Sequence, residues 1–233
     1  ILMKKNILVV AAHPDDEALG CGASISKWSK NGHKVNILFM SEGITARDSK
    51  RNFSLRKEEL DKHKIKAKKA AKILGAKSVN FCNFPDNRMD SVDLLDVTKS
   101  IEKFVKTFNP QLLVTHNHSD LNIDHKITHE ACITASRPQN KNPVKEILTF
   151  EVPSSTEWNF SIKQKNIFNP NYFENVSGFL KKKIKALECY KSEMRKWPHP
   201  RSYKAIQHLA KWRGATIGVE EAEAFELVRK IND

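Results

Sequence analysis

Apolar residues in the first 135 positions follow two spacings, one typical of buried strands and one typical of amphipathic helices. Short runs rich in β-branched residues predict strands that are buried on both faces. These runs fall at residues 6–12, 35–40, 78–82 and 112–115. Apolar residues that recur every three or four positions predict helices at 18–30, 55–74, 92–108 and 124–135. Because strands alternate with helices, we expect a Rossmann-like, three-layer α/β sandwich with a mostly parallel sheet.

The remainder of the chain is less regular and predicts a helical and loop extension of this core. The same spacings predict a strand, two helices and a last strand at residues 146–151, 173–195, 203–213 and 224–229. Residues 153–170 are rich in serine, asparagine and aromatic side chains, and predict a long loop that is a candidate lid. We expect a single domain over residues 1–233. Its core is at 4–151, and the part at 152–233 completes the fold and the substrate cleft.

The composition is typical of a soluble globular protein, with 39% hydrophobic and 29% charged residues. No apolar run approaches the ~20 residues that cross a bilayer, so no transmembrane segment is expected. The first apolar run is too short for the core of a signal peptide, and we expect a cytoplasmic protein. The four cysteines form no C-x-x-C pair, so reduced, packed thiols are expected rather than a disulfide framework.

The net charge of +13 arises mainly from lysine clusters, such as those at residues 62–72 and 181–185. Such clusters are typical of the solvated faces of long helices. They also suit an anionic partner, for which a phosphate-bearing sugar carrier, a membrane surface and nucleic acid are alternatives. The lysines are not interleaved with aromatic residues, and the chain contains no established nucleic-acid-binding motif. Nucleic acid is therefore not an expected partner.

Residues 13–17, His-Pro-Asp-Asp-Glu, directly follow the first predicted strand. Three carboxylates beside one imidazole repel each other unless a cation compensates their charge. Zinc binds imidazole nitrogen and carboxylate oxygen, and a catalytic zinc keeps three protein ligands and one open position. This turn can direct His13 and Asp16 at one point and leave Asp15 beside the metal. The alternative is a polar turn that caps the next helix, because acidic residues suit a helix N-terminus.

A second polar cluster spans residues 116–125 and follows the fourth predicted strand, with His129 one helical turn further on. Open parallel sheets bind ligands beyond the carboxyl ends of their strands, so the two clusters should face each other. One histidine from the second cluster would complete a site of two histidines and one carboxylate. The residues alone leave several candidates, which are His116, His118, His125 and His129.

The two motifs together resemble those of the PIG-L/LmbE-type N-acetylglucosaminyl deacetylases. Residues 13–17 match the first motif, and the segment 122–125, Asn-Ile-Asp-His, matches the second. The resemblance extends in element order over residues 4–129 and implies a zinc enzyme with a Rossmann-like sheet that acts on N-acetylated sugars. By position it implies a general base at Asp15 and metal ligands at His13, Asp16 and His125. It also implies substrate contacts by Arg56, at a helix start, and by Asp86, near the sugar hydroxyls.

Asn122 departs from this pattern, because several family members have a histidine three residues before the third metal ligand. An asparagine amide can donate a hydrogen bond to an oxyanion, but it cannot carry a positive charge or pass a proton. His199 is the candidate for that task, since prolines on both sides stiffen it. Arg201 follows as a candidate substrate-binding residue. The alternative is a rigid surface turn. The expected catalytic set is therefore Asp15, Asn122 and His199.

These residues predict a metal-dependent hydrolase that removes the acetyl group from an N-acetylated sugar or sugar conjugate and releases acetate and a free amine. Zinc is the expected cofactor, with iron(II) as an alternative because the ligand set suits both. A substrate that carries phosphate fits the positive charge, and homo-oligomerisation is left open. Two alternatives keep the same fold. One is a non-catalytic sugar-binding protein, and the other is a zinc amidase that acts on a thiol conjugate or an antibiotic precursor.

A dinucleotide-binding protein is a further alternative, because Gly20-x-Gly22 follows the first strand and Glu42 lies about 20 residues further on. Ile25 stands where that motif needs its third glycine, and the two glycines lie inside the predicted helix rather than in the turn. The acidic turn would also repel a pyrophosphate at the helix N-terminus. Close packing of the helix against the sheet explains the glycines better.

Overall fold

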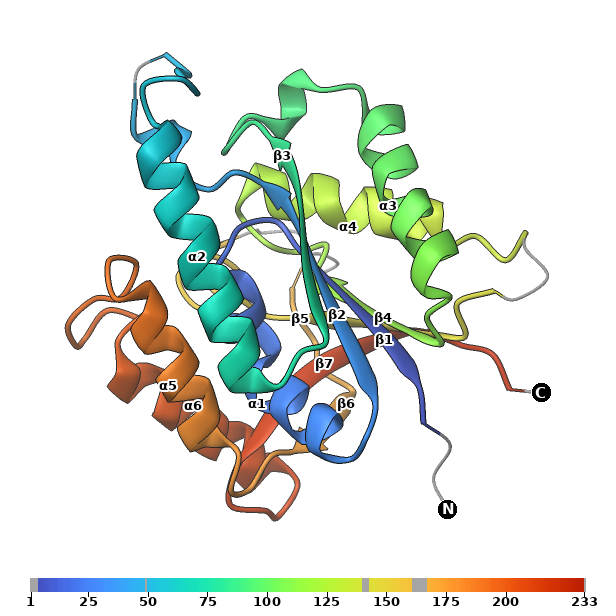
Figure 1. The fold of residues 1–233 in the computed structure, drawn as a ribbon. Coiled ribbons are helices and arrows are strands. Elements are labelled where there is room, and N and C mark those ends of the chain that lie inside the picture. The colour runs from blue at the N-terminus through green and yellow to red at the C-terminus, as the bar shows by residue number, and fades with distance from the viewer. Residues whose placement is uncertain (1–3, 49, 140–142, 161–166, 233) are drawn as a thin grey trace.

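The computed structural model describes residues 4–48, 50–139, 143–160 and 167–232. Within these residues a seven-stranded sheet has the order β3-β2-β1-β4-β5-β7-β6, and helices cover both of its faces (Figure 1). The strands from β3 to β5 are parallel, whereas β7 runs antiparallel to β5 and β6 runs antiparallel to β7. The expected three-layer α/β sandwich with a mostly parallel sheet is thus confirmed.

The strands are short apolar runs whose alternate residues face opposite layers of the fold. Ile7 and Val9 of β1 belong to one hydrophobic cluster, and Leu8 and Val10 belong to another. A strand that is buried on both faces has no position for a solvated side chain, which explains the unbroken apolar run. The strand bounds are β1 Asn6–Ala11, β2 Lys34–Ser41, β3 Ser78–Phe84, β4 Leu112–His116, β5 Glu146–Phe150, β6 Tyr172–Asn175 and β7 Ala222–Lys230.

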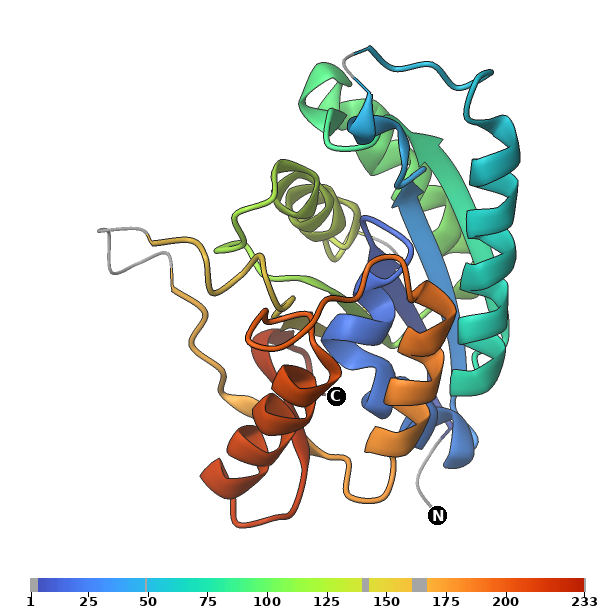
Figure 2. The same cartoon turned by 90° about the vertical axis from the view of Figure 1, so that its left-hand side faces the viewer.

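Two layers of helices enclose the sheet (Figure 2). The first hydrophobic cluster joins one face to α1 Asp16–Lys30, α2 Lys57–Leu74, α5 Leu180–Leu187 and α6 Tyr203–Thr216. The second joins the opposite face to α3 Leu94–Phe108 and α4 Ile123–Ala135. Short 3₁₀ helices lie at η1 Thr45–Arg47, η2 Met89–Ser91 and η4 Glu188–Tyr190. None of the helices in the described ranges combines the length and apolar character needed to cross a bilayer.

The direction of strand addition reverses at β1. From β1 the chain moves outward to β2 and β3, and then returns to the other side of β1 with β4 and β5. The loops that follow β1 and β4 therefore leave the sheet in opposite directions and open a crevice at the carboxyl ends of these strands. Each of the two polar clusters follows one of these strands, so the fold brings them to the same crevice.

The helix expected at 173–195 is wrong at both ends. Tyr172–Asn175 form β6, which pairs with β7, and only Leu180–Leu187 form α5 before η4 begins. Gly178 separates β6 from α5 with a φ of +83°, which a right-handed helix does not contain. The pairing of β6 with a strand about 50 residues further on cannot be detected from local spacing. The other predicted strands and helices are confirmed, with ends that differ by a few residues.

The chain after residue 152 contributes β6 and β7 to the sheet, packs α5 against α1 and α2, and packs α6 against β7 and α5. Of the loop expected at 153–170, residues 153–160 and 167–170 form no helix or strand. Residues 161–166 lie outside the described residues. The function of this loop as a lid stays a prediction.

Gly20 shows how closely α1 approaches the sheet. A Cβ at this position would lie 2.3 Å from Cδ2 of Phe150, a fully buried ring on β5. We expect Gly20→Ala to lower the free energy of unfolding by about 1–3 kcal/mol through overpacking. Urea unfolding measures this change. Gly22→Ala is the matched control, because the nearest atom to a Cβ there is Cγ of Lys183, at the longer distance of 3.2 Å. Equal stability of Gly20→Ala and the unsubstituted protein would contradict this account of the helix–sheet contact.

Candidate active site

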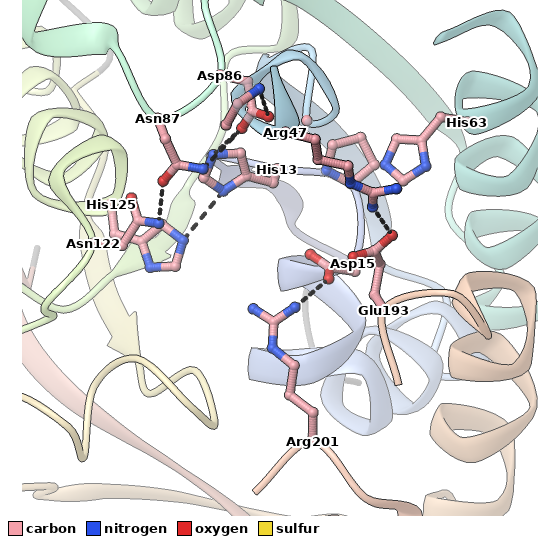
Figure 3. Close-up of a pocket in the computed structure, with 13 residues that line it drawn as sticks. His13, Asp15, Arg47, His63, Asp86, Asn87, Asn122, His125, Glu193 and Arg201 are labelled. Carbon is pink, nitrogen blue, oxygen red and sulfur yellow. Dashed lines mark hydrogen bonds and ion pairs between the residues drawn. The ribbon is translucent and has the colours of Figure 1, made fainter. Parts of the chain in front are cut away.

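The crevice at the carboxyl ends of β1 and β4 contains a pocket of about 240 Å³. Residues of both polar clusters line it, together with residues of the loops after β2 and β3 and of the segment after η4 (Figure 3). The site therefore combines the N-terminal core with the C-terminal part of the chain. The lining is mainly polar, which suits a ligand rich in hydrogen-bonding groups.

Three ligand atoms from distant turns converge at one side of this pocket. Nδ1 of His13 lies 3.3 Å from Oδ2 of Asp16 and 3.3 Å from Nε2 of His125. Nε2 of His125 lies 3.2 Å from the same carboxylate oxygen. Tetrahedral zinc with bonds of about 2.0–2.1 Å requires ligand atoms about 3.3 Å apart. The two imidazoles and the carboxylate therefore fit a single zinc-sized cation.

Other carboxylates fix the orientation of the two imidazoles. Nε2 of His13 lies 3.0 Å from Oδ2 of Asp124, and Oδ1 of Asp124 accepts a hydrogen bond from the backbone N–H of Met89 at 3.0 Å. Nδ1 of His125 lies 3.1 Å from Oδ1 of Asp120. Metal-binding histidines commonly direct their second nitrogen at a carboxylate in this way, which fixes the tautomer and the ring plane. Both imidazoles thus have the support expected of metal ligands.

The charge balance of the site also favours a cation. Burial disfavours protonation of His13, but hydrogen bonds with Asp124, Asp16 and Asp86 raise its pKa well above the usual value. Oδ1 of Asp16 is buried without a hydrogen-bond partner among the described residues. A divalent cation would neutralise this surplus of negative charge. The buried carboxylates around the buried histidines 13, 116 and 125 are Asp15, Asp16, Asp86, Asp120 and Asp124.

The structure separates the four histidine candidates of the second cluster. Only His125 directs a nitrogen at both His13 and Asp16. Nε2 of His116 accepts a hydrogen bond from the backbone N–H of Ala12 at 2.8 Å, and its ring stacks on that of His125 at 3.9 Å between centroids. Nδ1 of His129 donates to the carbonyl of residue 116 at 2.9 Å, and the ring of His118 packs against that of His129.

Asp15 lies beside the three ligand atoms in an unusual backbone conformation, with a φ of +135°. Non-glycine residues rarely adopt such a φ, and this strain is concentrated at functional sites. Glu17 holds the turn, because its Oε2 accepts the backbone N–H of Asp15 at 3.0 Å. Its Oε1 accepts a hydrogen bond from the hydroxyl of Tyr190 at 2.8 Å. Asp15 occupies the N-cap position of α1, but its side chain makes no capping hydrogen bond.

The carboxylate of Asp15 faces a cation from the far end of the chain. Nη1 of Arg201 donates to Oδ2 of Asp15 at 2.9 Å, and Nε of Arg201 donates to the hydroxyl of Ser154 at 2.7 Å. Burial raises the pKa of Asp15 to about 7, while the charge of Arg201 opposes this rise. Arg201 thus lies in the pocket wall, where its contact is with the predicted general base.

Asp86 and Asn122 also line the pocket. Oδ2 of Asp86 accepts the backbone N–H of Ala46 at 2.9 Å, and its Oδ1 lies 3.3 Å from Nε2 of His13. Oδ1 of Asn122 caps α4 by accepting the backbone N–H of Asp124 at 2.8 Å. Its Nδ2 donates to the side chain of Asn87 at 2.7 Å. Asn122 therefore keeps one amide hydrogen for a ligand.

Arg56 and His199 lie outside the pocket lining. Arg56 forms two hydrogen bonds with Asp48, at 2.7 and 2.9 Å, and a third with Glu59. Nδ1 of His199 accepts the backbone N–H of Arg201 at 3.0 Å, and its ring packs edge-on against Trp158. His199 thus supports the loop that carries Arg201. Arg56 is bound to carboxylates outside the pocket.

Arg47, His63 and Glu193 line the pocket, although the sequence did not indicate them. Nη2 of Arg47 lies 2.6 Å from Oε1 of Glu193, so an ion pair joins the loop after β2 to the segment after η4 (Figure 3). The two residues are 146 positions apart, and neither belongs to a motif. Their contact could therefore not be predicted from the spacing of residues in the sequence.

The glycines of the dinucleotide alternative lie inside α1, where they pack against Phe150 and Lys183. Glu42, the expected ribose contact, is buried and receives hydrogen bonds from Arg51 and Thr45. The glycines therefore form no open turn that could bind a pyrophosphate, and Glu42 is not available to a ribose. Close helix–sheet packing accounts for the glycines, as the sequence indicated.

The fold defines the class of protein as a Rossmann-like α/β protein, with a cluster of possible metal ligands in the crevice where the strand order reverses. The chain matches the PIG-L family, described as GlcNAc-PI de-N-acetylase, over residues 8–136. It belongs to this family, as its two motifs indicated.

The relatives of this chain include proteins that are named as deacetylases. The chain is 29% identical over 195 residues to the uncharacterized deacetylase YaiS of Escherichia coli (strain K12), with 81% of this chain and 92% of the relative covered. It is 25% identical over 237 residues to diacetylchitobiose deacetylase of Thermococcus kodakarensis, with 96% and 83% covered. N,N'-diacetylchitobiose deacetylase from Pyrococcus horikoshii superimposes with a TM-score of 0.73 at 21% identity, with 97% and 84% covered, which shows a shared fold.

Proposed function

We propose that this protein is a zinc-dependent hydrolase that removes the acetyl group from an N-acetylated sugar or sugar conjugate. The observation that carries the proposal is the mutual separation of 3.2–3.3 Å among the ligand atoms of His13, Asp16 and His125, next to a pocket. The family and the named activities of the relatives support the removal of an N-acetyl group. Iron(II) stays the alternative metal, because the same ligands suit it.

The proposed metal ligands are His13, Asp16 and His125. When bound there, a divalent cation supplies Lewis acidity towards the acetyl carbonyl and makes a water molecule more acidic. The protein supports this site through Asp124 and Asp120, whose carboxylates lie 3.0 and 3.1 Å from the second nitrogens of His13 and His125.

Asp15 is the proposed general base. Its carboxylate lines the pocket beside the ligand atoms, and it takes the proton of the attacking water. Arg201 fixes the orientation of this carboxylate through the contact of 2.9 Å. The protonated Asp15 then returns a proton to the leaving amine. Because His199 lies outside the pocket lining, Asp15 alone can carry both proton transfers.

Asn122 and Asp86 are proposed to bind the substrate around the reacting amide. The free amide hydrogen of Asn122 donates a hydrogen bond to the oxyanion that develops on the acetyl carbonyl. Asp86 accepts hydrogen bonds from sugar hydroxyls, since it lines the pocket next to His13. Arg47 is a better candidate than Arg56 for an anionic group of the substrate, because Arg47 lines the pocket.

Acetate release from a panel of N-acetylated sugars, with and without a chelator, tests the proposed function. We expect acetate and a free amine from at least one sugar. We also expect loss of this activity with the chelator, and its return on addition of zinc. Metal analysis of the same samples should give about one zinc ion per chain. Sugar binding without any acetate release from metal-loaded protein would favour the non-catalytic alternative. Activity that survives complete removal of the metal would refute the proposal.

A further inference from the structure

The helices on one face of the sheet carry an unusual distribution of charge. Residues 62–74 of α2, all of α5 and all of α6 contain lysine and arginine but no aspartate or glutamate. Contacts join α2 to α5 and α5 to α6, so these segments form one layer of the molecule. We call seven of their exposed lysines the lysine face, and define it as Lys69, Lys72, Lys181, Lys182, Lys185, Lys204 and Lys211.

Five of these lysines line two surface hollows, on either side of α5. A hollow of about 510 Å³ between α2 and α5 is lined by Lys72, Lys182 and the last residue of α1, Lys30. A second hollow of about 380 Å³ between α5 and α6 is lined by Lys181, Lys185 and Lys211. The second hollow also includes two carboxylates, Glu188 and Glu221. A positive field thus extends across α5 and both of its neighbours.

Two exposed tryptophans border the lysine face. Trp212 of α6 is 69% exposed and Trp197, just before α6, is 52% exposed. The ring of Trp197 packs edge-on against His208, and the ammonium of Lys204 lies 4.9 Å from its centroid. Trp212 follows His208 by four positions, so both indoles lie along the same side of α6. Large apolar groups that remain in water next to lysines indicate a surface that meets a partner.

We propose that the lysine face, with Trp197 and Trp212, docks the protein on an anionic lipid bilayer. Lysines attract the negative headgroups, while indoles are favoured at the boundary between headgroups and acyl chains. Nucleic acid is a less suitable partner. The guanidinium of Arg213, the arginine of this layer, is bound to Glu151 by two hydrogen bonds of 2.8 Å. The lysine face therefore offers ammonium groups rather than free guanidinium groups, whose planar forks suit nucleic-acid recognition.

One segment of the chain links the border of the lysine face to the pocket. The segment that follows η4 crosses the N-terminal end of α1 and leads into α6 (Figure 2). It carries Trp197 at the lysine face and Arg201 at Asp15. The inference does not depend on the proposed deacetylase activity, because it concerns a surface and is tested by binding alone.

Co-sedimentation with lipid vesicles is the first test. We expect the protein to bind vesicles in which about a third of the lipid is phosphatidylserine, and not to bind vesicles of pure phosphatidylcholine. High salt should release the bound protein. Each lysine near an anionic surface contributes about fivefold to the affinity for the vesicles. The triple variant K181E/K182E/K185E should therefore bind at least about 100-fold more weakly. The control K99E/K103E/K106E changes the net charge equally on α3, at the opposite face of the sheet, and should retain binding.

Quenching of tryptophan fluorescence by brominated lipids is the second test. We expect anionic vesicles with brominated chains to quench the unsubstituted protein but not W197F/W212F, in which Trp28 and Trp158 remain. Circular dichroism and thermal unfolding establish that each variant is folded. Three results would overturn the proposal: equal loss of binding in the two lysine variants, equal quenching in W197F/W212F, or tighter binding to a DNA duplex than to anionic vesicles at the same phosphate concentration.

Discussion

Replacing Asp15 with asparagine is expected to reduce turnover of an N-acetylated sugar by about 10²–10⁴-fold, the usual contribution of a positioned acid–base group. The substitution keeps the size of the side chain but removes its capacity to take a proton. The backbone should be unaffected, because asparagine has the shape of aspartate and, like it, occurs at positive φ more often than most non-glycine residues. Zinc content should stay at the level of the unsubstituted protein, since Asp15 is not one of the proposed ligands.

Steady-state acetate release and metal analysis on the same preparation measure this result. Arg201→Met is the companion variant, because it removes the cation that contacts Asp15 and leaves the carboxylate in place. It should lose less turnover than Asp15→Asn. If Asp15→Asn retains full turnover, Asp15 has no role in proton transfer. A loss of zinc in Asp15→Asn would show that this residue belongs to the metal site instead.

The arrangement of the sheet could be predicted because its signals are local. Unbroken apolar runs such as Ile7–Ala11 mark strands buried on both faces, and the helices between them force parallel pairing. The place of the site followed from the same pattern, because polar residues after β1 and β4 must meet where the strand order reverses. The resemblance to known deacetylases then indicated His125 among several histidines. In the structure, Nε2 of His125 lies within 3.3 Å of both His13 and Asp16.

The remainder of the site could not be predicted, because long-range contacts determine it. Arg56 stands at a helix start as the resemblance requires, but Asp48 and Glu59 engage it, whereas Arg47 reaches the pocket. The short strand β6 was missed for a similar reason, since only its pairing with β7 defines it. Asp124 lay inside a recognised motif, yet its contact with His13 depends on how α4 packs beside β1. These contacts become visible only after the fold is known.

Replacing Asp16 with alanine is expected to remove the metal and all measurable acetate release. Three ligand atoms hold the proposed cation, and loss of a supporting residue outside the ligand set already weakens metal binding by about 10–100-fold. Loss of a ligand should exceed the upper end of that range. Asp16 has a second task, because its Oδ2 accepts the backbone N–H of His13 at 2.9 Å and so holds the turn. Alanine removes both functions.

Asp16→Asn separates the two functions, because the amide oxygen still accepts the N–H of His13 but the negative charge is lost. We expect it to keep the fold and to bind zinc weakly. Thermal unfolding gives an independent measure. A ligand present at 100 times its Kd stabilises the folded state by about 2.7 kcal/mol, so a chelator should lower the Tm of the unsubstituted protein but not that of Asp16→Ala.

His129→Ala is the matched control for the loss of a ligand. His129 lies one helical turn beyond His125, and its Nδ1 donates to the carbonyl of residue 116 instead of facing the ligand cluster. Because this variant removes a nearby histidine from the same helix, it should keep its zinc and its response to the chelator. If His129→Ala and Asp16→Ala lose zinc equally, or if Asp16→Ala keeps one zinc ion per chain, the three converging side chains are not the metal ligands.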